Sequence, residues 1–97
     1  MYTIGHLLKE IREEIGLPLQ EVQQELGIDL TLLSKIENGK RLPTIEQLQK
    51  LSKFYNYDDK LLIIQRESDK IANSLEYPEL ATETLKVAED KIKYGNL

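Results

Sequence analysis

Apolar residues recur every three or four positions along most of the chain, which places them on one face of an α-helix. The alternation of apolar and polar residues that is typical of a strand extends over only a few positions. Glycines and capping residues divide the pattern into six predicted helices. These are expected at Ile4–Ile15, Pro18 to about Leu26, Leu30 to about Asn38, Ile45–Tyr55, Asp58 or Asp59 to about Leu75, and Glu79 to about Tyr94. The fold class is therefore predicted to be all-α.

The second and third predicted helices are joined by only three residues, Gly27-Ile28-Asp29. A connection of this length is too short for antiparallel packing, but it suits a sharp corner between two helices. The spacing therefore predicts a helix-turn-helix. Because helix pairs with glycine turns are common, the corner alone leaves DNA binding and a purely structural role both open.

Composition limits the classes of function. The 97 residues suit one domain, with room for an appendage. They contain no cysteine and one histidine, which excludes thiolate and histidine-cluster metal sites. The formal net charge of -4 is unevenly distributed. Residues 29–56 carry five basic and three acidic side chains, a local charge of +2, between two acidic ends. A basic middle of this kind can still form a phosphate-facing surface.

Residues 4–64, taken together, closely resemble the Cro/C1-type (XRE-type) family of helix-turn-helix regulators. The resemblance is carried by Ile4-Gly5, Arg12, Gly16-Leu17, Glu21, Leu26-Gly27-Ile28, the run Ser34-Lys35-Ile36-Glu37-Asn38-Gly39-Lys40, and Pro43. It implies a five-helix, lambda-repressor-like bundle with an added C-terminal helix. We therefore expect a DNA-binding domain at residues 1–65 and a helical extension at 66–97 that serves packing or dimerisation.

The resemblance also implies roles for individual residues. In this family the third helix enters the major groove of double-stranded DNA. The expected base contacts are Leu30, Thr31, Ser34 and Lys35, and the expected backbone contacts are Asn38, Lys40 and Arg41. Lys35 could donate to guanine, and Leu30 could touch a thymine methyl group. Arg12 and Glu37 match an ion pair of the family, which we interpret as structural.

The chain departs from the family pattern at the second helix. The family has a capping Ser or Thr followed by Gln, which reaches a phosphate, where this chain has Pro18 and Leu19. Neither side chain donates a hydrogen bond, so one backbone contact is lost. Gln23 stands where the family has a small Ala, which bears on the close packing of the two helices. The apolar Leu30 could also serve a contact with protein.

The C-terminal third contains more apolar residues than one helix face can bury. Leu61, Leu62, Ile63 and Ile64 are consecutive, so some of them must meet a second surface. In one interpretation the last helix folds back over the fifth, using the stripe formed by Ala81, Leu85, Ala88 and Ile92. In the other, the residues form a homodimer interface, because regulators of this family bind palindromes as dimers. The two are compatible, and the expected packing residues are Leu61, Leu62, Ile63, Ile64, Ile71 and Leu75.

Catalysis is not expected. His6 has no nucleophile partner in the sequence, and the scattered glycines form no phosphate-binding loop, so we expect no enzyme, cofactor or metal. No apolar run is long enough to span a membrane, and a cytoplasmic location in a bacterial or phage context is expected.

The functional prediction is a transcription regulator that binds DNA as a homodimer. Such small regulators include restriction–modification controllers, phage repressors and antitoxins, and we favour the controllers by analogy alone. The alternative is an antitoxin or adaptor that uses the helix-turn-helix as a scaffold and binds a partner protein through its C-terminal helices.

Overall fold

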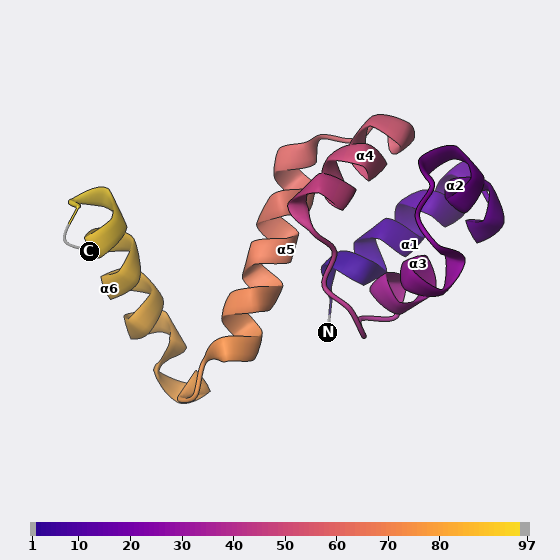
Figure 1. The fold of residues 1–97 in the computed structure, drawn as a ribbon. Helices are drawn as coiled ribbons and strands as arrows, with labels where there is room; N and C mark the ends of the chain where they lie inside the picture. The colour runs from indigo at the N-terminus through magenta and orange to yellow at the C-terminus, as the bar shows by residue number, and fades with distance from the viewer. Residues whose placement is uncertain (1, 96–97) are drawn as a thin grey trace.

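The computed structural model describes residues 2–95, and over this range the chain is helical with no strand (Figure 1). The helices are α1 (Ile4–Ile15), α2 (Leu19–Leu26), α3 (Leu30–Glu37), α4 (Ile45–Tyr55), α5 (Asp59–Ser74), a 3-10 turn η1 (Pro78–Leu80) and α6 (Ala81–Lys93). The all-α prediction is confirmed. Pro18 precedes α2 instead of lying in its first turn, and Asn38 caps α3 instead of belonging to it. None of the described helices is long and apolar enough to cross a membrane.

Helices α1 to α5 pack around one hydrophobic core. Each of them contributes buried apolar side chains, namely Ile4, Leu8, Ile11, Val22, Leu33, Ile36, Leu48, Leu51, Tyr55 and Leu62, and Ile28 adds one from the corner before α3. Leu62, one of the expected packing residues, is fully buried in this core, so its side chain is not available to a surface between copies. The neighbouring Ile63 is partly buried against the same core, whereas Leu61 and Ile64 are exposed.

Gly5 allows α1 to approach α3 very closely. A Cβ atom at this position would clash with the carbonyl oxygen of Ile36 and touch that of Glu37. Both oxygens are backbone atoms at the end of α3, so they cannot swing away as a flexible side chain could. The absence of a side chain at Gly5 therefore sets how the C-terminal end of α3 rests on α1.

Helix α5 is anchored to the bundle along more of its length than its apolar residues indicate. The Asp69 carboxylate accepts a hydrogen bond from the Ile4 N–H at 2.9 Å, and Arg66 Nε donates to the Pro43 carbonyl at 2.6 Å. The first contact satisfies a backbone donor at the start of α1 that has no partner within its own helix. The domain boundary expected after residue 65 therefore lies inside a continuous helix whose contacts with the bundle reach residue 69.

Helix α6 lies apart from the bundle. Figure 1 shows α5 and α6 diverging from the turn between them, and no residue of α6 is buried. The prediction that the last helix folds back over the fifth is therefore wrong for the single chain. The physical reason lies in the connection: Leu75 ends α5 in an extended conformation, and Pro78 starts the tight turn that leads into α6. The stripe on α6 remains exposed, and only Ala81 is partly covered.

Candidate nucleic-acid interface

The corner between α2 and α3 consists of three consecutive residues, each of which has a different structural role. Gly27 ends α2 in the left-handed conformation, with φ of 67°. Ile28 is buried in the core, which fixes the corner to the bundle. Asp29 caps α3, because its carboxylate accepts hydrogen bonds from the backbone N–H groups of Thr31 and Leu32. The direction of α3 is therefore held at its N-terminus by both packing and capping.

Helix α3 presents opposite faces to the core and to solvent. Leu33 and Ile36 are buried, whereas Thr31 and Lys35 are exposed and Leu30 and Ser34 are half-exposed. The four expected base-contacting residues thus share one open groove, together with Pro18, Leu19 and Gln20 from the start of α2. Gln20 is absent from the residues expected from sequence. Its signal would have been its place in the first turn of α2, where a polar side chain can reach past the helix end.

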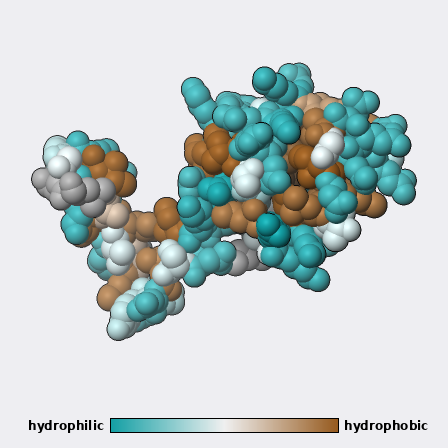
Figure 2. Space-filling model, viewed as in Figure 1, coloured by the Kyte–Doolittle hydropathy of each residue, from teal (hydrophilic) through white to brown (hydrophobic). Residues whose placement is uncertain are grey.

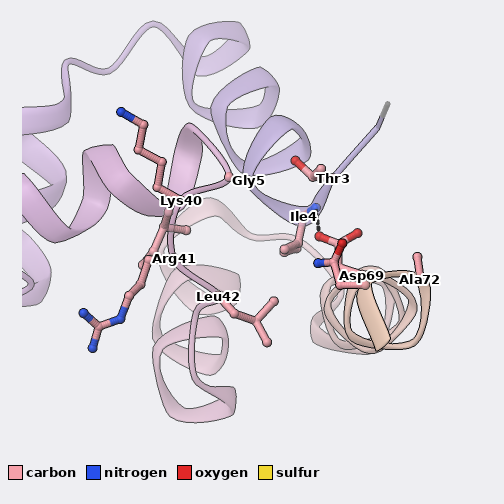
Figure 3. Close-up of a pocket in the computed structure, with 11 residues that line it drawn as sticks. Thr3, Ile4, Gly5, Lys40, Arg41, Leu42, Asp69 and Ala72 are labelled. Carbon is pink, nitrogen blue, oxygen red and sulfur yellow. Dashed lines mark hydrogen bonds between the residues drawn. The ribbon is translucent and has the colours of Figure 1, made fainter. Parts of the chain in front are cut away.

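The segment after α3 turns sharply and leaves two cations in solvent. Gly39, with φ of 75°, donates to the Ile36 carbonyl, and Lys40 donates its N–H to the Lys35 carbonyl at 2.9 Å. This pair of bonds is the Schellman ending of a helix, in which glycine is favoured. Lys40 and Arg41 are exposed, and Figure 3 shows both side chains extending away from Asp69. Asn38, at the end of α3, donates from Nδ2 to Ser34 Oγ at 3.4 Å.

A cavity of about 230 Å³ lies behind this segment, between the start of α1 and the second half of α5 (Figure 3). Its lining includes Thr3, Leu42 and Ala72 beside the hydrogen bond between Asp69 and Ile4. Asp69 is already bonded to the α1 backbone, and the side chains of Lys40 and Arg41, which also contribute to the lining, extend away from Asp69 (Figure 3). We therefore assign it to the joint between α1 and α5.

Arg12 and Glu37 join α1 to the end of α3. Arg12 Nε donates to Glu37 Oε2 at 2.8 Å and Nη2 donates to Oε1 at 2.9 Å, while Nη1 donates to the Leu17 carbonyl at 2.8 Å. The two side chains are only 13% and 7% exposed. The hydrogen bonds with Glu37 raise the pKa of Arg12 above its usual value. Burial, with the nearby Glu37 charge, raises the pKa of Tyr55 to about 12.

The acidic groups at the two ends of α3 are already engaged. Asp29 accepts from the backbone at the start of α3, and Glu37 is paired with Arg12 at its end. No acidic side chain lines the groove, whereas Lys35 does. The surface is therefore locally favourable for an anion although the whole chain carries a net charge of -4.

The geometry agrees with the comparison with known families. The helix-turn-helix family matches residues 8–62, more than half of the chain, and this range contains α2, the corner, α3 and α4. No curated protein and no solved structure matches the chain significantly. The chain carries a DNA-binding domain and belongs to the helix-turn-helix family of the Cro/C1 (XRE) type.

Proposed function

We propose that the protein is a sequence-specific transcription regulator that binds a near-palindromic operator as a homodimer, with α3 in the major groove. The observation that carries this proposal is the open groove formed by the solvent face of α3 and the start of α2. It combines a cation, two hydroxyl groups and two leucines, which are the side-chain types that read base edges.

Base readout is assigned to the face of α3. Lys35 is exposed and can donate to guanine O6 and N7, and the hydroxyl groups of Thr31 and Ser34 can donate or accept. Leu30 lies beside Leu19 in the groove, and together they give an apolar contact suited to a thymine methyl group.

Backbone contacts are assigned to the segment after α3. Asn38, Lys40 and Arg41 are exposed there, and phosphate contacts of this kind fix the register of the protein on DNA without reading sequence. The phosphate contact that Pro18 and Leu19 cannot make is assigned to Gln20, which is exposed and lines the same groove. Lys40 and Arg41 give two cations in each protomer and four in a dimer. At about 0.9 per phosphate, the dependence of log affinity on log salt should therefore have a slope of about −3.6.

Substitution of Lys35 tests base readout. Lys35→Ala should weaken binding to the selected operator by about tenfold to a hundredfold and change binding to random DNA little, because a base contact contributes about 1–3 kcal/mol of discrimination. The control is Lys86→Ala, since Lys86 lies on α6 and lines no part of the groove. An equal loss on operator and random DNA would show that Lys35 contacts only the backbone.

We further propose that the regulator acts by occupying DNA near its own gene, as a restriction–modification controller does. The support is analogy with small regulators of the family. Footprinting on the DNA upstream of its own operon tests this, and an unprotected upstream region would contradict autoregulation.

The exposed face of α6 favours one alternative, an antitoxin or adaptor that binds a partner protein through its C-terminal helices. The two functions differ in their response to salt. A flat salt dependence, or no measurable DNA binding, would favour the adaptor over the regulator.

A further inference from the structure

Helix α5 carries a second apolar face opposite the one that packs on the bundle. Its bundle side bears Leu62 in the core and the hydrogen-bonding Arg66 and Asp69. The other side bears a stripe that we call the α5 stripe: Leu61, Ile64, Ser68 and Ile71. Its steps of three, four and three residues are those of a coiled-coil helix. Leu61, Ile64 and Ile71 are 48%, 61% and 43% exposed, so this face is largely open to solvent within residues 2–95.

Helix α6 carries a stripe of the same kind. Ala81, Leu85, Ala88 and Ile92, which we call the α6 stripe, are separated by steps of four, three and four residues. Leu85 and Ile92 are 44% and 69% exposed, and Figure 2 shows brown apolar atoms on the part of the molecule that lies away from the main body. A 13-residue helix that buries nothing is only marginally stable in water. Packing of its apolar face against another surface would supply the missing stabilisation.

We propose that α6 of each protomer packs along the α5 stripe of a second copy of this chain, so that the two α5 and two α6 helices form a four-helix bundle. This inference rests on the proposed homodimer and names the surface that forms it. The helix-turn-helix units remain outside the four-helix bundle, with their α3 faces free for DNA.

Two properties of the stripes favour a second copy as the occupant. First, the α6 stripe alternates small alanines with larger Leu85 and Ile92, which leaves room for the bulky side chains of the α5 stripe. At 1.5 Å per residue the α5 and α6 stripes are about 15 and 17 Å long, so they also match in length. Each chain thus has one α5 stripe and one α6 stripe. In a dimer, each α6 stripe packs on the α5 stripe of the other chain, so that all four stripes are covered.

Second, the charges of the two helices allow copies to associate. Residues 59–74 contain three acidic and three basic side chains, and residues 81–93 also contain three of each. Both helices are therefore neutral with mixed signs, so two copies do not repel each other. A strongly charged partner such as a nucleic acid or an acidic peptide would gain little from either surface.

Engineered cysteines test the contact, because the chain has no native cysteine. Ser68 and Ala88 are both exposed and lie near the middle of their stripes. The two residues should therefore lie close together whether the packed helices run parallel or antiparallel. Ser68→Cys and Ala88→Cys chains, mixed in equal amounts and mildly oxidised, should give the mixed disulfide dimer as the main product. Lys86→Cys, on the polar face of α6, is the control and should cross-link poorly to Ser68→Cys. No excess of the mixed dimer over this control would overturn the proposal.

The double variant Ser68→Cys/Ala88→Cys shows whether α6 contacts α5 of a second chain or α5 of its own chain. Covalent dimers are expected at low protein concentration after oxidation of the native assembly. A monomer with an internal disulfide would overturn the proposal, because it would place α6 on α5 of its own chain.

A substitution on α6 tests whether the α6 stripe contributes to the stability of the dimer. Leu85→Asp should raise the dimer dissociation constant by about a hundredfold or more, because it places a charge in a packed stripe of both protomers. Lys86→Asp introduces the same residue on the polar face and should leave the dimer intact, as measured by light scattering after size-exclusion chromatography. Equal effects of the two substitutions, or a wild-type protein that stays monomeric, would overturn the proposal.

The DNA measurements separate this inference from the proposed function. Leu85→Asp should keep the bundle fold and bind single half-sites, while its affinity for the full palindrome falls. If two wild-type chains bind a palindrome but the Ser68→Cys and Ala88→Cys chains give no mixed disulfide above the control, the α6 exchange is overturned and the regulator stands. Failure to enrich any DNA sequence would contradict the regulator itself.

Discussion

Removal of the Glu37 carboxylate should destabilise the domain strongly. In the native chain, Arg12 makes two hydrogen bonds to Glu37 and one to the Leu17 carbonyl, so it joins α1, the α1–α2 connection and the end of α3. The Arg12 side chain is only 13% exposed in the native chain, and Glu37→Ala leaves two of its donors without their partner. Arg12 cannot escape the cost by losing a proton, because a guanidinium group keeps its charge in proteins even without an acidic partner.

The expected loss is about 3 kcal/mol. Breaking a buried ion pair from one side costs about 3–5 kcal/mol, and we take the lower end because Arg12 keeps its bond to Leu17. For a domain of this size, 1 kcal/mol lowers the melting temperature by about 4–8 °C, so the expected decrease is about 12–24 °C. Small domains have only about 5–15 kcal/mol of total stability, so the variant should lie close to its unfolding threshold.

Urea unfolding followed by helical circular dichroism measures this loss directly. Glu14→Ala is the control, since Glu14 is exposed on α1, and it should change stability by less than about 0.5 kcal/mol. Replacing both partners with leucine should restore part of the stability, because no unpaired charge then remains. A loss below about 1 kcal/mol for Glu37→Ala would refute the reasoning, because that is the behaviour of a solvent-exposed pair.

Three further predictions follow from other contacts. Gly5→Ala should destabilise the domain by about 2 kcal/mol or more, because its methyl group meets the backbone of Ile36; an unchanged unfolding midpoint would contradict this close approach. The pKa of Tyr55, raised to about 12 from about 10 in the unfolded chain, means that its contribution to stability is complete below pH 10 and is lost towards pH 12. The stability difference between wild type and Tyr55→Phe should therefore change by about 2 kcal/mol over that range, and a constant difference would argue against burial of the phenol. Uracil in place of the contacted thymine should weaken wild-type binding several-fold but not that of Leu30→Ala, and equal losses would exclude a methyl contact by Leu30.

The helix boundaries are predictable from sequence because their signals are local. Thr44 and Gln47 form a capping box, and Thr3 and Asp29 accept hydrogen bonds at the starts of α1 and α3. Gly16 and Gly27 end their helices in the left-handed conformation. Each of these features depends on residues within one helical turn, so the pattern along the chain contains the necessary information.

The contacts that sequence reasoning missed join distant residues or depend on a direction in space. Asp69 caps α1 from 65 residues away, and no local pattern distinguishes it from other exposed acids. Leu62 and Leu61 are adjacent leucines, yet only the angle at which α5 meets the bundle buries one and exposes the other. The position of α6 depends on the turn at Pro78, whose path the apolar stripe does not specify. Gln20 joins the groove only because α2 and α3 meet at their N-terminal ends.

Selection of bound duplexes from a random DNA pool, followed by sequencing, tests the central claim most directly. The wild-type chain should enrich an inverted repeat whose half-sites lie about 10 base pairs apart, centre to centre, one for each α3 of a dimer. Recovery of a pool with no enriched sequence would contradict the account, because it would leave the helix-turn-helix without a DNA sequence to read.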